Sequence, residues 1–211
     1  MQSEYYLSGG FMEKKNKWSI GVVFGTLLLV GLPAWADYTD GHNAYINEDF
    51  ETAFLEWEPL AKMGDADAQN MLGLMYRSGQ GVGQDFEKAE EWYRRSADQG
   101  NPSAQSNLGL VYWYGLGVSK DHQQAFHWFL RAAEQGNAAG QNHLGLMYFT
   151  GKGVAQDYVQ SYKWAYLAAN QGQDPAIQAL SMLKKVMTLQ QIEEAKALAR
   201  NWSSKGTEEV L

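Results

Sequence analysis

A 36-residue period runs through most of the chain and limits what it can fold into. Residues 68–103, 104–139 and 140–175 align with one another without a gap. Each unit contains Leu-Gly-Leu, a tyrosine two positions later, then Gly-x-Gly-Val, an aspartate and a tryptophan. A tandem period of about 20–50 residues is typical of solenoids, in which each unit packs only on its neighbours.

Each unit carries the pattern of two helices joined by a glycine loop. In the first unit Leu72 and Tyr76 lie at i and i+4, which places them on one face of a helix over 68–78. A Gly-x-Gly segment then ends that helix. Asp85 is positioned to cap a second helix, because its carboxylate can accept hydrogen bonds from first-turn amides. Gly100 is positioned to end this second helix in the left-handed conformation.

A glycine recurs in the middle of each first helix, at Gly73, Gly109 and Gly145. Glycine within a helix costs about 1 kcal/mol relative to alanine, so its repetition requires a compensating contact. We expect the paired helices to approach closely at these points. The small residues expected opposite the glycines are Ala89, Ala125 and Ser161.

The segments on either side of the three units predict further helices. Residues 37–67 predict a shorter, tetratricopeptide-like helix pair that lacks the glycine loop. Residues 176–202 predict two capping helices, the second of which begins with a capping box from Thr188 to Gln191. Capping helices protect the ends of stacked arrays. Residues 203–211 are expected to form a flexible tail.

The repeated motif closely resembles that of the Sel-1-like repeat family, which is related to tetratricopeptide repeats. The shared pattern is Ala-Gln-x-x-Leu-Gly-Leu-x-Tyr, then Gly-x-Gly-Val, Asp, Ala, Trp and Ala-Ala-x-x-Gly. It departs from the family at three positions, where Ser96, Gly140 and Ser161 replace alanine. The resemblance covers about residues 40–202 and implies an all-α fold, a right-handed α/α solenoid of about ten helices. It also implies a concave face that binds peptides.

Residues 12–36 have the pattern of an export signal. Three lysines precede a 13-residue apolar run at 20–32, and a proline and an Ala-Trp-Ala motif follow. This pattern predicts a signal peptide over residues 1–36 that is cleaved after Ala36, with Met12 as the expected start. The run is shorter than the roughly 20 residues of a membrane-spanning helix. We therefore expect a periplasmic or secreted protein, anchored at the inner membrane only if the segment stays uncleaved.

The composition excludes several function classes. Twenty-four acidic residues against 17 basic ones give a net charge of -7, the wrong sign for a protein that binds the phosphate backbone of nucleic acids. The absence of cysteine excludes a disulfide framework, thiolate zinc sites and a cysteine nucleophile. A hydrophobic content of 45% is sufficient for a buried core.

No set of catalytic residues is evident. Ser181 and Lys184 form the Ser-x-x-Lys of penicillin-binding proteins and serine β-lactamases, but the companion Ser-Asp-Asn and Lys-Thr-Gly motifs are absent. Both residues also fall on a predicted capping helix. The four histidines, at 42, 122, 127 and 143, have no metal-ligand spacing. We therefore predict a protein that is not an enzyme and uses no metal or cofactor.

The candidate binding surface lies on one face of the first helices. A row at positions 77, 113 and 149 changes residue type while the surrounding scaffold does not, so the fold does not require a particular side chain there. An alternative is that the aromatic members of this row only pack between neighbouring helices. The candidate partner-binding residues are Asn70, Arg77, Ser106, Asn107, Trp113, Tyr114, Asn142, His143 and Phe149.

These observations predict an exported, monomeric interaction scaffold whose partner is an extended peptide or an envelope protein. One alternative is a protein that binds or hydrolyses cell-wall fragments or β-lactams, which turnover of such a compound by the pure protein would reveal. Another is a signal-anchored regulator of an inner-membrane protein. Retention of residues 1–36 in the mature protein would distinguish that regulator from an exported scaffold.

Overall fold

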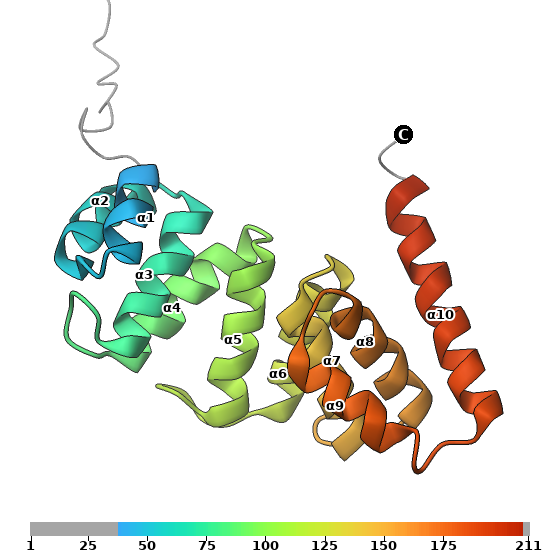
Figure 1. Ribbon diagram of the computed structural model, residues 1–211. Coiled ribbons are helices and arrows are strands. Elements are labelled where there is room, and N and C mark those ends of the chain that lie inside the picture. Colours follow the sequence, from blue (N-terminus) through green and yellow to red (C-terminus); the bar gives the residue numbers. More distant parts are fainter. Residues whose placement is uncertain (1–37, 209–211) are drawn as a thin grey trace, which may run out of the picture. The chain divides into compact units, whose positions relative to one another are not determined.

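The computed structural model of the protein describes residues 38–208, with side chains up to residue 202. The predicted signal peptide and the expected start at Met12 lie outside the described residues. Within the described range the chain forms ten helices and no strand (Figure 1). The helices are α1 (Tyr38–Ile46), α2 (Phe50–Lys62), α3 (Ala66–Ser78), α4 (Phe86–Asp98), α5 (Pro102–Tyr114), α6 (His122–Glu134), α7 (Ala138–Thr150), α8 (Tyr158–Asn170), α9 (Asp174–Leu183) and α10 (Leu189–Glu208).

The helices stack in chain order. Each helix from α1 to α8 packs against the next one along the chain, and α10 packs against α8. In addition, α5 contacts α7 and α7 contacts α9, so these odd-numbered helices form a continuous row. Contacts between sequence neighbours are the defining property of a solenoid, and the predicted all-α solenoid is confirmed.

Repeated polar side chains set the ends of the helices. Asp121 Oδ1 accepts hydrogen bonds from the amides of Gln123 and Gln124 in the first turn of α6, as predicted for the aspartate of each unit. The capping box before α10 is also confirmed, since Gln191 N donates to Thr188 Oγ1 at 3.3 Å and Thr188 N donates to Gln191 Oε1 at 2.9 Å. The helix that follows runs to Glu208, beyond the expected start of the flexible tail at residue 203.

Two of the three mid-helix glycines, Gly73 and Gly109, have different partners from those expected. A Cβ atom at Gly73 would lie 2.6 Å from the Tyr93 ring, and one at Gly109 would lie 2.6 Å from the Phe129 ring. An aromatic ring of the second helix therefore lies directly on the glycine. The expected partners, one turn earlier, were Ala89 and Ala125. Burial of these large rings offsets the helix-propensity cost of the glycines.

The second glycine of each Gly-x-Gly loop joins one repeat to the preceding repeat. Gly117 has a φ of 71°, and a Cβ atom there would lie 2.6 Å from the carbonyl carbon of Phe86 at the start of α4. Only a residue without a side chain allows the loop to lie so close to this backbone. The equivalent pairs are Gly81 with Phe50 and Gly153 with His122.

A buried glutamine in each first helix links three consecutive helices. Gln105 is 1% exposed; its Nε2 donates to the Ala97 carbonyl at 3.2 Å and its Oε1 accepts from Gln135 Nε2 at 2.7 Å. These bonds tie α5 to the ends of α4 and α6. The equivalent residues are Gln69, with Ala61 and Gln99, and Gln141, with Ala133 and Gln171. The glutamine of the repeated Ala-Gln motif is therefore structural.

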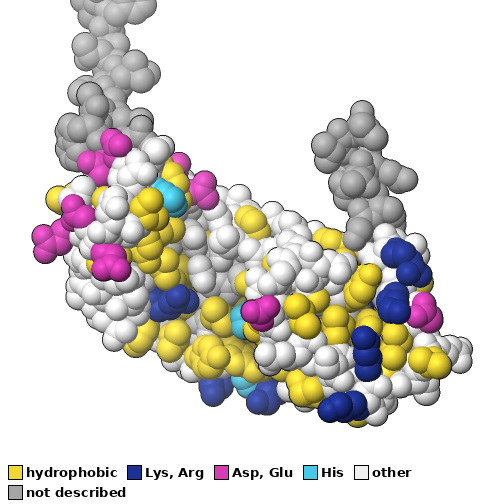
Figure 2. Space-filling view, viewed as in Figure 1, with side chains coloured by type: hydrophobic (Ala, Val, Ile, Leu, Met, Phe, Trp, Pro, Cys, Tyr) yellow, Lys and Arg dark blue, Asp and Glu magenta, His cyan; other side chains and the backbone are white. Residues whose placement is uncertain are grey.

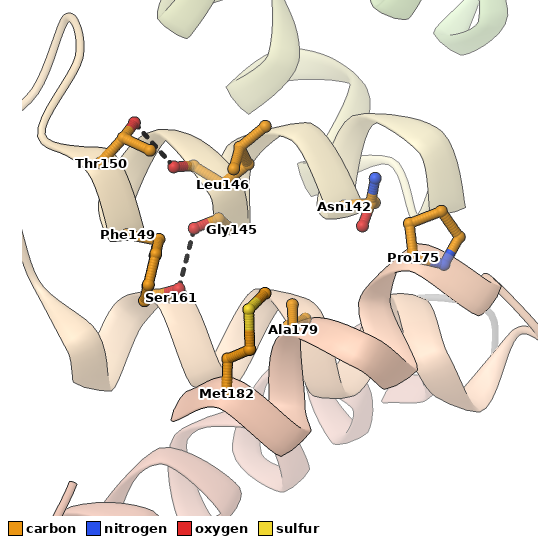
Figure 3. A pocket seen from close by; sticks show the side chains of 10 residues that line it. Asn142, Gly145, Leu146, Phe149, Thr150, Ser161, Pro175, Ala179 and Met182 are labelled. Atoms are coloured by element: carbon orange, nitrogen blue, oxygen red, sulfur yellow. Dashed lines mark hydrogen bonds between the residues drawn. The ribbon is translucent and has the colours of Figure 1, made fainter. Parts of the chain in front are cut away.

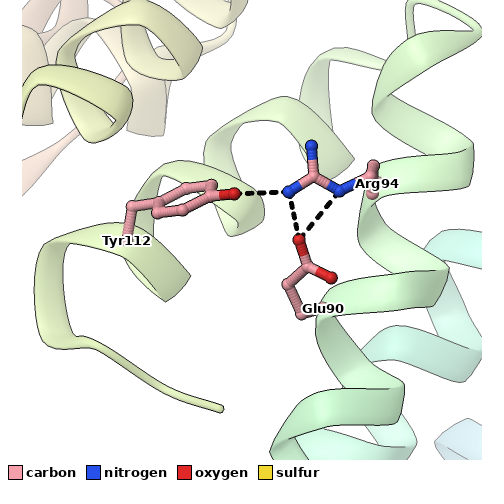
Figure 4. Close-up of polar contacts among 3 residues, drawn as sticks. All are labelled: Glu90, Arg94 and Tyr112. Atoms are coloured by element: carbon pink, nitrogen blue, oxygen red, sulfur yellow. Dashed lines mark hydrogen bonds and ion pairs between the residues drawn. The ribbon is translucent and has the colours of Figure 1, made fainter. Parts of the chain in front are cut away.

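A further polar contact joins α4 to α5 (Figure 4). Arg94 Nε donates to Glu90 Oε1 at 2.8 Å, and Arg94 Nη2 contacts both this carboxylate and the Tyr112 hydroxyl. Leu130 and Tyr166 replace the arginine in the next two units, so this contact occurs only between the first and second repeats.

Candidate binding site

All nine predicted partner-binding residues lie on three odd-numbered helices. Asn70 and Arg77 lie on α3, four residues lie on α5, and the rest lie on α7. Their side chains differ in accessibility. Ser106 is 4% exposed because α5 packs against α4, α6 and α7, and this burial removes Ser106 from the accessible surface. Asn107 Nδ2 donates to Asn70 Oδ1 at 2.9 Å, so these two amides serve first to join α5 to α3.

The aromatic members of the variable row pack on the second helix of their own repeat. The Trp113 ring lies 4.6 Å from the His122 ring, and the Phe149 ring lies 5.7 Å from the Tyr158 ring, measured between centroids. Both side chains are half-buried. Packing between helices, the alternative considered for this row, therefore accounts for part of the surface of each ring. Tyr114, next in the chain, is 60% exposed.

His143 is held against an aromatic ring. Its imidazole stacks on Phe129 with centroids 4.8 Å apart and an interplanar angle of 26°. Burial lowers the pKa of His143 below its ordinary value, because a charged imidazolium would lose hydration there. The neutral form is therefore favoured in the fold, as expected of a histidine packed against an aromatic ring. The described residues contain no cluster of three or more histidines and carboxylates that could hold a metal ion.

A cavity opens between α7, α8 and α9 (Figure 3). Its volume is about 210 Å³, and none of its lining residues is charged. The lining is mainly apolar, and the cavity opens at a rim where Leu146 and Met182 are 44% and 51% exposed. The lining residues are Asn142, Gly145, Leu146, Phe149, Thr150, Ser161, Ala165, Pro175, Ala179 and Met182.

A change of residue type in the third repeat explains why the cavity exists there. Ala165 stands where the first two units have Tyr93 and Phe129, the rings that cover Gly73 and Gly109. Alanine leaves this space open. A Cβ atom at Gly145 would instead meet backbone atoms of Ser161 and Ala165, each at 3.2 Å. The close approach expected at Ser161 thus occurs through the backbone.

The opposite wall of the cavity, on α9, also has a smaller residue than the equivalent positions of the earlier helices. Ala179 on α9 occupies the position of Asn107 on α5 and His143 on α7, one and two periods earlier. In the second repeat the Phe129 ring fills the space and stacks on His143. In the third repeat both contributors are alanine, so neither side chain fills it.

Most of the cavity was not predicted from the sequence. Asn142 and Phe149 belong to the predicted surface and also line the cavity, whereas Ala165, Ala179 and Met182 were not predicted. A signal for the first two is present in the 36-residue period, where a larger residue becomes alanine at Ala165 in the third unit and at Ala179 just after it. Their proximity depends on the packing of α9, which lies outside the three aligned units.

The polar groups of the cavity are suited to binding rather than to proton transfer. Thr150 Oγ1 donates to the Leu146 carbonyl at 2.9 Å, and Ser161 Oγ donates to the Gly145 carbonyl at 2.8 Å. Both hydroxyls thus already donate to backbone carbonyls, Thr150 within α7 and Ser161 from α8 to α7 (Figure 3). The Asn142 side chain, by contrast, makes no hydrogen bond to any other described residue and remains able to bind a ligand.

The Ser-x-x-Lys motif forms no comparable site. Ser181 and Lys184 are both exposed on or next to α9, and Ser181 Oγ donates to the Ile177 carbonyl at 3.3 Å.

Figure 2 shows acidic side chains gathered over α1 and α2, with lysine and arginine nearer α9 and α10. Residues 38–67 contain eight acidic residues and one lysine. No helix in the described part of the chain is long and apolar enough to cross a membrane.

The stacked helix pairs with glycine loops define an α/α-solenoid repeat protein. The family model described as Sel1 repeat matches residues 66–101, 102–137 and 138–173, which begin two residues before the units aligned above. The chain belongs to the Sel1 repeat family. Proteins of this family are generally interaction scaffolds and are typically not enzymes.

Two solved structures are similar to this chain. A Sel1 repeat protein from Oxalobacter formigenes is 32% identical with a TM-score of 0.65; the match covers 69% of this chain and 60% of that one. The protein c5321, described as a protective antigen of uropathogenic Escherichia coli strains with an SLR fold, is 27% identical with a TM-score of 0.56. That match covers 81% of this chain and 46% of c5321. This chain therefore spans less than two thirds of the length of each of these two solved structures. No curated protein sequence matches this chain significantly.

Proposed function

We propose that this protein is an exported, non-enzymatic scaffold that binds an extended segment of an envelope protein along α3, α5 and α7. The observation that supports this most directly is the uncharged, mainly apolar cavity beside α7. It lies next to a row of side chains that vary between repeats while the scaffold stays constant. Apolar pockets with a few polar groups are the usual form of binding sites. The predicted signal peptide supports the envelope as the compartment.

Site-specific photocrosslinking in intact cells tests this function. A photoreactive residue at Leu146, exposed on α7, should capture one protein or a few envelope proteins. The same residue at His127, exposed on α6 of the second repeat, should not capture them. A synthetic peptide covering the captured segment should then bind the purified protein. Identical adducts at both positions, or a peptide that does not bind, would contradict the proposal.

The compartment is tested independently of the partner. Cell fractionation should place the protein in the envelope, and the intact mass of the isolated protein should correspond to cleavage after Ala36. An intact mass that retains residues 12–36 would instead favour the signal-anchored form.

A further inference from the structure

The cavity of the third repeat has the position of an aromatic ring that the first two repeats supply themselves. Tyr93 is 0% exposed and Phe129 is 1% exposed, and each ring lies on the mid-helix glycine of its repeat. In the third repeat Gly145 is present, but Ala165 provides no ring. In the first two repeats the equivalent space is therefore occupied by a planar, six-membered ring.

From this comparison we infer that the cavity receives one aromatic side chain of the bound peptide, which replaces the ring missing at Ala165. This inference rests on the proposed function and names the chemistry that the site selects. The volume of about 210 Å³ is sufficient, because apolar cavities of about 150 Å³ already bind benzene. Aromatic side chains also bury large areas and often dominate binding energy at interfaces.

The ring of Phe129 shows which walls such a side chain contacts. In the second repeat Phe129 lies between Gly109 and His143. The corresponding walls of the cavity are Gly145 and Ala179. Because Ala179 is smaller than His143, the cavity can also hold a ring larger than phenyl, such as indole. Phe129 needs no polar partner at its position, and the Tyr93 hydroxyl has none among the described residues, so an aromatic group without a hydroxyl is sufficient.

Asn142 is placed to bind the backbone of the same peptide. Its amide lies at the cavity and makes no hydrogen bond to another described residue, whereas the equivalent Asn70 accepts a hydrogen bond from Asn107 and the equivalent Ser106 is buried. An asparagine side chain can donate to a peptide carbonyl and accept from a peptide amide. The cavity thus selects the side chain, and Asn142 orients the segment that carries it.

The test is a selection from a displayed library of random 12-residue peptides on the full chain, followed by affinity measurements. Selected peptides should share Phe, Tyr or Trp at one position, and replacement of that residue by alanine should weaken binding at least tenfold. Ala165→Phe, which restores the residue of the second repeat, should weaken binding of the original peptides at least tenfold. The matched Ala155→Phe, in an exposed loop, should bind as the wild type does.

Circular dichroism identifies variants that do not fold. If Ala165→Phe fails to fold, Ala179→Phe fills the cavity from α9 and carries the same expectation. Binding to the filled variant within twofold of wild type, or selected peptides without a shared aromatic position, would overturn the inference. If such peptides still lose binding on Tyr114→Glu, at a candidate residue of α5 that is 60% exposed, the proposed function stands without the aromatic site. A library that yields no binder contradicts both the aromatic site and the proposed peptide-binding function.

A second copy of the chain is the main competing occupant. Size-exclusion chromatography with light scattering should give a monomer for both wild type and Ala165→Phe. A wild-type dimer that becomes monomeric on Ala165→Phe would show that the cavity holds another copy, and would overturn the assignment to a peptide partner.

Discussion

A single position, occupied by Tyr93, Phe129 and Ala165 in successive repeats, decides whether the space between helices is filled or open. In the first two repeats the buried ring stabilises the helix pair, since losing a buried aromatic typically costs about 3–5 kcal/mol. The alanine of the third repeat gives up that contact. The space that an aromatic ring fills in the first two repeats is thus a cavity in the third repeat, at the surface that we expect to bind partners.

The neighbouring residue His143 makes a pH-dependent contribution to stability. Its pKa is lowered in the fold by burial, so the unfolded chain takes up a proton at higher pH than the folded chain does. The free energy of unfolding should therefore be fully retained above about pH 6.5, the ordinary pKa of histidine, and should fall as the pH decreases below it. His143→Asn, which installs the residue of the preceding repeat, should lack this part of the decrease.

Urea unfolding of the two proteins between pH 8 and pH 5 measures the difference. The other three histidines are present in both proteins, so their contributions cancel in the comparison. Parallel stability curves for wild type and His143→Asn would show that burial does not perturb this histidine.

At the scale of helices and loops, the Gly-x-Gly segments are joints between repeats. Each one ends a first helix with a left-handed glycine, such as Gly115 with a φ of 75°. Its second glycine then lies against the start of the preceding second helix. The loop therefore sets both where the helix stops and how the next repeat stacks.

This role predicts unequal costs for two glycine substitutions. Gly117→Ala should lower the free energy of unfolding by about 3 kcal/mol, because a left-handed alanine costs about 1–2 kcal/mol and the methyl group would also press on the Phe86 backbone. Gly136→Ala should lower it only by the conformational cost, since its φ is similar at 83° and no atom lies within 4 Å of the added carbon. Denaturant unfolding measures both values, and equal costs would rule out the contact between repeats.

At the scale of the whole molecule, stability is expected to be local. Each helix from α1 to α8 packs on the next one along the chain, few other pairs of described helices are in contact, and α10 closes the array by packing on α8. Trp202 of α10 lies 5.7 Å from the Trp164 ring of α8, measured between centroids. In such an array the stability of each repeat depends mainly on the adjacent interfaces.

Ala199→Glu tests this locality. Ala199 is 1% exposed in a core cluster with Trp164 and Leu167, so a glutamate would bury a charge among apolar side chains at a cost of several kcal/mol. Hydrogen–deuterium exchange should accelerate in α8 and α10 and remain unchanged in α1 to α3. Glu194→Ala, at an exposed position of α10, should change neither region. Faster exchange throughout the described helices would indicate a single cooperative unit instead.

The period, the helix pairs, their caps and the glycine turns follow from the sequence alone, because each depends on residues close together in the chain. An aspartate cap such as Asp121 acts within its own first turn, and a left-handed glycine such as Gly115 acts on its own helix. Repetition in register made these local signals unambiguous. The row of variable residues on the first helices also followed from the same alignment.

Contacts between repeats required the tertiary structure. The burial of Ser106, the pairing of Asn70 with Asn107 and the stacking of His143 on Phe129 each depend on how one helix lies against another. The cavity depends on the placement of α9, which carries Ala179 to the space beside Ala165. The sequence records both alanines, but only packing shows that they face the same space, because helix stacking rather than chain proximity brings them together.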